Sequence, residues 1–359
     1  AIGRGSMSAA ALSNANVGVG VNTLSSLSQS SGTSTYNVAV GYNAGKEITT
    51  GTNNTLIGSL AGDAIQDGSH NTTLGYDAGS GLTSAASSVL IGSFAGRAIT
   101  TGGGNVAVGY ASLFTQGSNG SYSTAVGFRA LEDQNISSQS HNVAVGYYAG
   151  KDITSGDKNT IVGSNAGQAL TGGAQSVLIG HEAGYTLNLG GQNIAIGPGA
   201  LYSEDGHGKN IAIGYEALYT QNAGADGYNV AIGHQAGKAV TTGKYNVLVG
   251  GLAGDSITGG EYNVALGYNA LAAEDGHGRN IAIGTNALAN QNVGGDAYNV
   301  AIGHNAGLTI NTGSNNTLVG GLAGTNMTDA TFNTLLGYNA GAAIVGGSQN
   351  TLIGALSGD

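Results

Sequence analysis

The sequence contains no cysteine, no tryptophan and a single proline, Pro198. The absence of cysteine excludes disulfide bonds and thiolate metal sites, so side-chain packing and backbone hydrogen bonds must hold the fold together. Charged residues make up only 8% of the chain, against about 25% in ordinary globular proteins. Disordered chains combine low hydrophobicity with high charge, whereas 40% of these residues are hydrophobic, which argues against disorder.

Further absences narrow the classes of function. The net charge is -10 and the ten basic residues do not cluster, so we expect no nucleic-acid partner. No apolar run approaches the roughly 20 residues of a membrane span, so we expect no membrane insertion. No signal peptide is visible and the chain opens at Ala1-Ile2-Gly3, so we expect a fragment of a longer protein.

Glycine, by contrast, supplies 67 of the 359 residues. Collagen is excluded, because glycine does not fall at every third position. Instead, a short signature that ends in glycine, such as Asn-Val-Ala-Val-Gly at 37–41, returns along the whole chain. There are 21 such glycines, mostly 17 residues apart, with spacings of 18, 19 or 21 at five places. This period predicts an all-β parallel β-solenoid, or β-roll, of about 21 coils, as one continuous domain over residues 1–359.

Each coil is expected to contain a strand at the three residues before the signature glycine, where Val, Ile, Thr and Leu are concentrated. Side chains alternate along a strand, so Val38 and Val40 share one face while Ala39 points to the other, and both faces are apolar. A strand that is apolar on both faces is buried on both sides. One face can fill the coil, and we expect another copy of the chain to cover the second. The glycine itself is predicted at a corner that requires positive φ or a close backbone approach.

The coil interior follows a second rule. Three residues after the signature glycine comes alanine, followed either by glycine, as at 44–45, or by leucine, as at 130–131. In the first kind of coil a large aliphatic residue stands seven positions after the signature glycine, as Ile48 does; in the second kind that position is polar or small, as in Glu204. We therefore predict one interior aliphatic from either of two places, in a flattened two-stranded coil with room for three or four apolar side chains. Such a coil buries little surface by itself, so we predict a homotrimer that forms a rod, rising about 4.8 Å per coil to roughly 100 Å.

A third regularity lies four residues before each signature glycine. This slot is asparagine in 17 of 20 coils and serine in the other three. Stacked coils would align these side chains in a ladder of amide hydrogen bonds, as in cross-β stacks. The predicted structural ladder includes Asn37, Asn54, Asn71, Asn105, Asn142, Asn159, Asn193, Asn210, Asn229, Asn246, Asn263, Asn280, Asn299, Asn316, Asn333 and Asn350.

Residues that suggest catalysis are few. His181, His234 and His304 alternate with tyrosine in the slot after the signature glycine, which indicates packing or surface positions. The element Glu204-Asp205-Gly206-His207-Gly208-Lys209 returns 70 residues later with Arg in place of Lys, as duplication of a four-coil block would leave it. Neighbouring side chains on a strand point apart, so we interpret the element as a polar turn. We expect no catalytic residue, no metal site and no cofactor, and hence no enzyme.

Tyrosine in the slot after the signature glycine has two interpretations. Aromatic rings spaced along a polar surface can stack on the apolar faces of sugars, and they can equally pack over turns with their hydroxyls in water. Both interpretations stay open. The candidates for receptor or glycan contact are Tyr42, Tyr76, Tyr110, Tyr147, Tyr215, Tyr268 and Tyr338.

The Asn-x-Ala-Ile-Gly element, with alanine shortly after the glycine, resembles the head repeat of trimeric autotransporter adhesins, which forms a left-handed parallel β-roll trimer. The longer form, Asn-Thr-Leu-Ile-Gly-x-x-Ala-Gly at 54–62, is more similar to repeats of bacteriophage tail-fibre proteins. The resemblance covers the whole chain. Adhesin head repeats are usually shorter than 17 residues, which favours the phage fibre.

The resemblance implies a structural protein of the virion, the shaft of a phage tail fibre, located in the virion. Its implied partners are two further copies of the chain, other tail proteins and a host-surface glycan or protein. The alternative is the head of a trimeric adhesin on the bacterial cell surface. A glycan-degrading tailspike would need paired carboxylates in a groove and a wider coil, and neither is visible.

Overall fold

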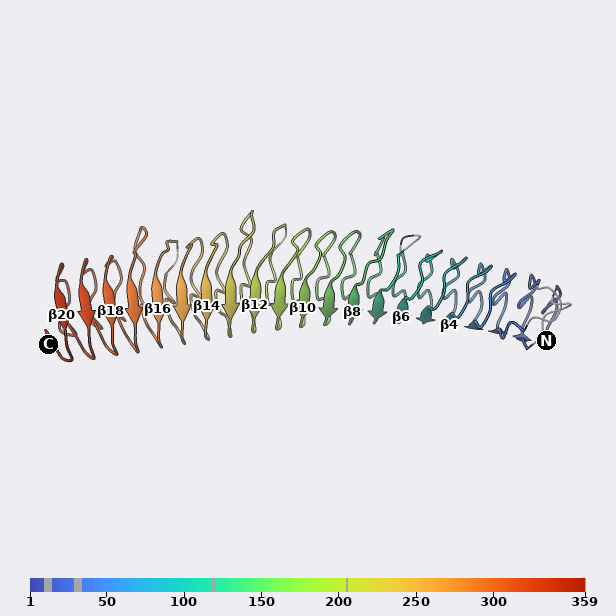
Figure 1. The fold of residues 1–359 in the computed structure, drawn as a ribbon, viewed down its shortest axis with the longest axis horizontal. Coiled ribbons are helices and arrows are strands. Elements are labelled where there is room, and N and C mark those ends of the chain that lie inside the picture. Colours follow the sequence, from blue (N-terminus) through green and yellow to red (C-terminus); the bar gives the residue numbers. More distant parts are fainter. Residues whose placement is uncertain are drawn as a thin grey trace. The chain divides into compact units, whose positions relative to one another are not determined.

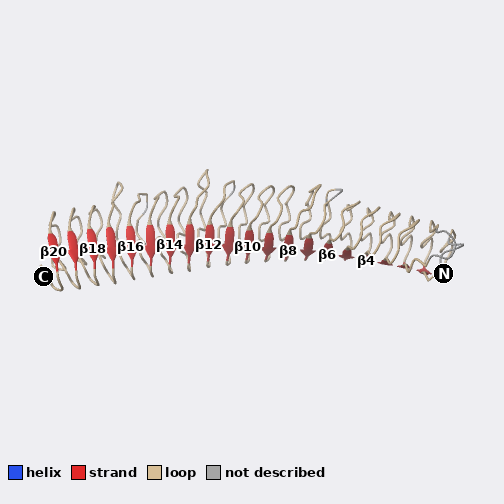
Figure 2. Cartoon of the chain, in the orientation of Figure 1, coloured by secondary structure: helices blue, strands red, loops and turns tan. Residues whose placement is uncertain are grey.

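The computed structural model describes residues 1–9, 15–28, 34–115, 117, 120–204, 206–274 and 276–358. They form an all-β parallel β-solenoid of about 19 turns with a 17-residue period, and no helix occurs among them (Figure 2). The first predicted coil joins the next through an isolated bridge, between Ile2 and Val19, and through bonds such as that from the Met7 N–H to the Thr23 carbonyl oxygen at 2.8 Å.

The chain divides into two compact units, Ala1–Leu178 and Ile179–Asp359, built from the same turn. The single continuous domain over residues 1–359 stays a prediction. The N-terminal unit contains β1 (Val17–Val19), β2 (Val38–Val40), β3 (Thr55–Ile57), β4 (Thr72–Leu74), β5 (Val89–Ile91), β6 (Val106–Val108), β7 (Thr124–Val126), β8 (Val143–Val145) and β9 (Thr160–Val162). The unit boundary falls within β10 (Val177–Ile179). The C-terminal unit contains β11 (Ile194–Ile196), β12 (Ile211–Ile213), β13 (Val230–Ile232), β14 (Val247–Val249), β15 (Val264–Leu266), β16 (Ile281–Ile283), β17 (Val300–Ile302), β18 (Thr317–Val319), β19 (Thr334–Leu336) and β20 (Thr351–Ile353).

Successive strands of each unit lie side by side and pair in parallel (Figure 1). The register is one full repeat, so Ala39 pairs with Leu56 and Ala231 pairs with Leu248. Equivalent residues of successive turns therefore form columns, and the strand positions predicted from the signature are confirmed.

The core of each unit lies inside the turns. The middle residue of each strand points inward, and Leu56 and Leu248 are fully buried. The prediction that an interior aliphatic comes from either of two places is also confirmed, because both sets are fully buried. They are Ile48, Ile65, Ile99, Ile153, Val240, Ile257 and Ile310 in one kind of turn, and Leu131, Leu201, Leu218, Leu271 and Leu288 in the other.

The prediction of two strands per turn is wrong, because each turn among the described residues has a single named strand. After the signature glycine the backbone adopts positive φ at Asn43 (55°) and again at Gly45 (57°), which folds the chain into turns. These turns still bond to the next repeat, as when the Gly45 N–H donates to the Ala61 carbonyl oxygen at 3.0 Å. Stacking therefore continues around the turn without a second sheet.

The signature glycines from Gly3 to Gly146 and from Gly180 to Gly337 meet both predicted requirements. Gly250 has φ of 135°, and a Cβ built on it would lie 2.4 Å from the carbonyl oxygen of Gly267 in the next turn. The prediction of positive φ and close backbone approach is confirmed.

Replacing Gly250 by alanine is expected to lower the free energy of unfolding by about 3 kcal/mol or more, because the new methyl group meets backbone that cannot move without breaking the register. The matched control is Gly276→Ala, where a Cβ meets no atom within 4 Å. We expect the control to stay within about 0.5 kcal/mol of the parent chain in denaturant titrations. If the two substitutions lowered the free energy of unfolding equally, the close backbone approach at Gly250 would not be the reason for the glycine.

Candidate functional site

The asparagine column lies inside the turns and bonds from one turn to the next. The backbone N–H and the side-chain Nδ2 of Asn54 both donate to Oδ1 of Asn37, at 2.9 and 3.1 Å. Nδ2 of Asn54 also donates to the carbonyl oxygen of Gly68 at 2.9 Å. The same bonds recur in the C-terminal unit, for example around Asn246. All the predicted ladder positions are buried except Asn350, which is half-buried.

Buried glutamines, which sequence reasoning missed, support this column. Gln221 and Gln291 are fully buried seven residues after a signature glycine. Their Oε1 atoms accept hydrogen bonds from Nδ2 of Asn229 and Asn299, at 3.0 and 2.6 Å. Both glutamines stand in turns of 19 residues whose interior aliphatic is Leu218 or Leu288, so the seventh position is left for an amide that binds the column.

The duplicated polar element places Glu204 and Glu274 inside the turns, where both are fully buried. Oε1 of Glu204 accepts a hydrogen bond from the backbone N–H of His207 at 3.1 Å, and the second copy repeats this bond. Asp205 and Asp275 lie outside the described residues. Within the described part of the chain no three His, Asp or Glu side chains are grouped so as to hold a metal ion.

The seven candidate tyrosines are exposed, with exposed fractions of 41–59%. They do not form one continuous column. Tyr110 and Tyr147 both stack on Phe128, with ring centroids 5.2 and 5.5 Å apart, and Tyr76 meets Tyr110 through Phe94 in edge-to-face contacts. Among the other candidates, Tyr215 stacks on His234, whereas Tyr42, Tyr268 and Tyr338 touch no other described aromatic ring.

Two other tyrosine columns occur in the C-terminal unit. Tyr185, Tyr202 and Tyr219 stack at 5.1 and 4.8 Å, five residues after successive signature glycines. Tyr245 stacks between Tyr228 and Tyr262 at 5.6 and 5.0 Å. Because rings at this spacing cover one another, they present mainly their edges to solvent.

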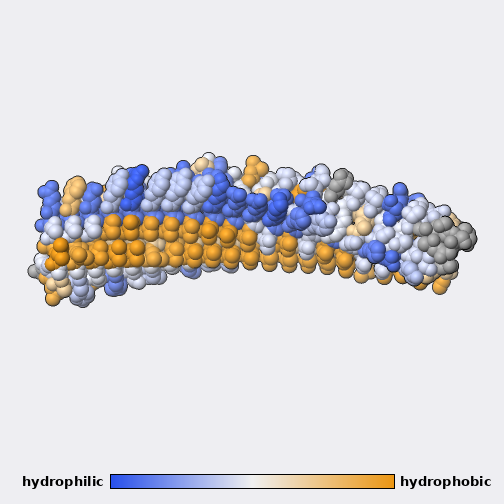
Figure 3. All heavy atoms as spheres, in the orientation of Figure 1, coloured by the Kyte–Doolittle hydropathy of each residue, from blue (hydrophilic) through white to orange (hydrophobic). Residues whose placement is uncertain are grey.

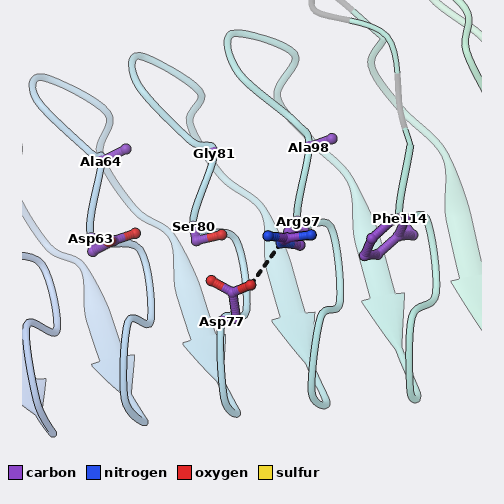
Figure 4. Close-up of a pocket in the computed structure, with 8 residues that line it drawn as sticks. All are labelled: Asp63, Ala64, Asp77, Ser80, Gly81, Arg97, Ala98 and Phe114. Carbon is purple, nitrogen blue, oxygen red and sulfur yellow. Dashed lines mark ion pairs between the residues drawn. The ribbon is translucent and has the colours of Figure 1, made fainter.

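A shallow hollow of about 420 Å³ opens on the N-terminal unit (Figure 4). Arg97 crosses it and pairs with Asp77 at 2.6 Å, while Phe114 closes one side and Asp63 the other. Burial, together with the nearby charge of Asp77, raises the pKa of the Asp63 carboxyl. With two carboxylates, a guanidinium and a ring, the hollow can bind polar groups, but Asp77 already neutralises Arg97.

A second hollow, on the C-terminal unit, has Gly199 between Glu182 and Glu216. The ammonium group of Lys238 lies 2.7 Å from Oε2 of Glu216. Hydrogen bonds from Lys238 and then from Gln235 lower the pKa of Glu216 to about 2. This carboxylate therefore stays charged and paired at any pH at which a ligand would be tested.

Sequence reasoning missed the aromatic and cationic residues two and five positions after the signature glycine. Phe94 and Arg129 occupy the first of these offsets, and Arg97 and Phe114 the second. A column-by-column alignment of the turns would have found them, because both offsets otherwise carry mostly small or polar residues. Their mutual contacts needed the structure.

Comparison of the chain with protein-family models, with curated proteins and with solved structures found no match. Over the described residues, no helical segment has the length and apolar character needed to cross a membrane.

Replacing Asn246 by alanine is expected to lower the free energy of unfolding by about 2–4 kcal/mol, because it leaves the N–H of Asn263 buried without its acceptor. The control is Asn222→Ala, at an exposed position, with an expected change within about 0.5 kcal/mol. Denaturant titration of both variants measures the difference. An unchanged unfolding midpoint in the Asn246 variant would show that the asparagine column does not stabilise the fold.

The pair of Glu216 and Lys238 predicts a pH dependence. The carboxyl pKa is lower in the folded chain than its ordinary value of 4.5, so the pair stabilises the fold above pH 4.5 and this contribution disappears as the pH falls towards about 2. Because Lys238 is partly exposed, we expect less than about 1 kcal/mol. Lys238→Met should flatten the pH dependence of thermal unfolding in this window. Lys244→Met, which removes a cation 3.5 Å from Glu261, controls for loss of any positive charge.

Proposed function

We propose that the chain is a structural fibre protein, whose turns associate with further copies of the same chain through the outer face of the strands. The observation that carries the proposal is an uncovered apolar surface. The last residue of every strand is Val, Ile or Leu, and the first is Val, Ile or Thr. Leu266 and Leu336 are 44% and 46% exposed. In the C-terminal unit the last strand positions form an unbroken apolar row, while the first positions are Val or Ile from β11 to β17 and Thr from β18 to β20 (Figure 3).

Such a surface is costly in water. Monomeric proteins rarely expose contiguous apolar patches larger than a few hundred Å², and here no charged residue interrupts the two outer columns of either unit. β-branched side chains at regular spacing make ridges about 4.8 Å apart. A second copy of the chain has the same ridge spacing, so its ridges can match along many turns. A partner without this period would match only locally.

The resemblance to phage tail-fibre repeats supports three copies, a place in the virion and contact with other tail proteins. The adhesin head is the alternative and would use the same face in the same way. In either case the repeated turn supplies length and stiffness. The exposed tyrosines and the hollows of the turns are where a host receptor would bind.

Analytical ultracentrifugation of the full chain tests the proposal. We expect a trimer with three times the chain mass of 35.1 kDa. Leu266→Asp, on the strand face, should weaken association because each copy would bury a charge without a partner. The matched control is Leu189→Asp, since Leu189 is 65% exposed outside the strands. A folded, soluble monomer of the parent chain would overturn the proposal.

A further inference from the structure

One surface pocket in the N-terminal unit combines aromatic faces with paired charges, and we call it the Ala111 pocket. Ala111 forms its floor, and its walls are Phe94, Arg97, Tyr110, Phe114, Arg129 and Glu132.

The pocket exists because the column of side chains two residues after the signature glycines has a small residue between two large ones. Phe94, Ala111 and Arg129 stand two residues after successive signature glycines, so the small Ala111 lies between two large side chains. The gap spans two strand spacings, or about 10 Å. The volume is about 230 Å³, below the roughly 300–1,000 Å³ of sites for drug-sized ligands, so the pocket fits a single small ring.

The phenylalanine and tyrosine walls of the pocket pack edge to face. Phe94 meets Tyr110 and Phe114 edge to face, with interplanar angles of 90° and 78°. In the tyrosine columns of the C-terminal unit, by contrast, the rings stack and cover one another. Among the described residues, neither Phe94 nor Phe114 has another ring stacked on it, and the Arg97 guanidinium lies over both, at 5.7 and 5.6 Å, so a ligand that brings C–H groups meets these rings beside Arg97.

The polar walls hold a donor and an acceptor side by side. Arg129 Nε lies 3.4 Å from Oε1 of Glu132. Arg129 Nε and Glu132 Oε2 are both buried, and neither has a hydrogen-bond partner within the described residues. A hydroxyl group both donates and accepts, so vicinal hydroxyls of one ligand can bind the two atoms together.

The charges of the pocket argue for a neutral ligand. Arg97 is paired with Asp77 at 2.6 Å and Arg129 is paired with Glu132. An anion would compete with carboxylates already in place, and a quaternary ammonium group would be repelled by two guanidinium groups that lie over the same rings. A ligand ring with an apolar face and several hydroxyl groups can contact the aromatic rings and also bond to the polar atoms of the pocket.

We propose that the Ala111 pocket binds one pyranose ring of a neutral saccharide. The ring packs against Phe114 and Phe94 beside Arg97, and its hydroxyls bond to Arg129 and Glu132. The site lies within the N-terminal unit and needs no second copy of the chain, so it stands whether or not the proposed fibre assembly holds.

Isothermal titration calorimetry of the full chain tests the site, with three probes: methyl α-D-glucopyranoside, methyl β-D-galactopyranoside and methyl N-acetyl-β-D-glucosaminide. We expect saturable binding of at least one, with a Kd on the order of 1 mM. Phe114→Ala and Glu132→Gln should each weaken that binding at least about tenfold. The matched controls are Phe332→Ala, at a ring 59% exposed in the other unit, and Glu261→Gln, and both should bind as the parent does.

Circular dichroism shows whether each variant keeps the fold, and Glu132→Gln retains the shape of the side chain. The proposal fails if the parent chain binds none of the three glycosides. It also fails if adenosine or inorganic phosphate binds more tightly, since that would indicate a base or anion site. Equal binding by the parent and a folded Glu132→Gln chain would place the saccharide elsewhere.

Discussion

The parallel register between consecutive turns is the constraint on which the rest of each unit depends. Because each strand residue pairs with its equivalent one repeat later, as Val230 does with Val247, each strand side chain stacks on its counterpart about 4.8 Å away. A polar side chain can then be buried without losing its hydrogen bonds only if it can bond to the equivalent side chain of the next turn. Asparagine does so, since its Oδ1 accepts the N–H of the next asparagine while its Nδ2 remains free to donate. The parallel register of the strands and the asparagine column therefore stabilise each other.

The same self-stacking explains the composition. A charge placed in an inner column would lie beside its own copy in the next turn, at a separation where like charges repel strongly in a buried setting. Charged residues are accordingly rare, and several of those on the outside pair across turns. Lys209 bonds to Asp226, and the second copy of that element pairs Arg279 with Asp296. The 8% of charged residues is thus a consequence of repetition.

The sequence period was enough to predict the strands and the interior, because both depend on residue type at a fixed offset. The position of β2 at Val38–Val40 and the burial of Ile48 follow from such offsets. The single strand per turn could not be predicted in this way. It depends on positive φ at residues such as Asn43 and Leu60, and leucine gives no sign of that conformation by itself. The pocket walls were missed for a related reason, since offsets two and five carry varied residues whose contacts arise only when the turns stack.

The two kinds of surface on the turn have opposite requirements. The strand face is nearly uniform, and uniformity suits a partner that repeats with the same period. A local binding site needs the reverse, a place where one turn differs from its neighbours. On a scaffold with fixed spacing a single substitution can create such a place: Ala111, standing between Phe94 and Arg129, opens a gap two turns wide whose walls the register already holds in position. The fixed register requires similar residues inside successive turns. The same register holds the walls of a surface pocket in place before a ligand binds.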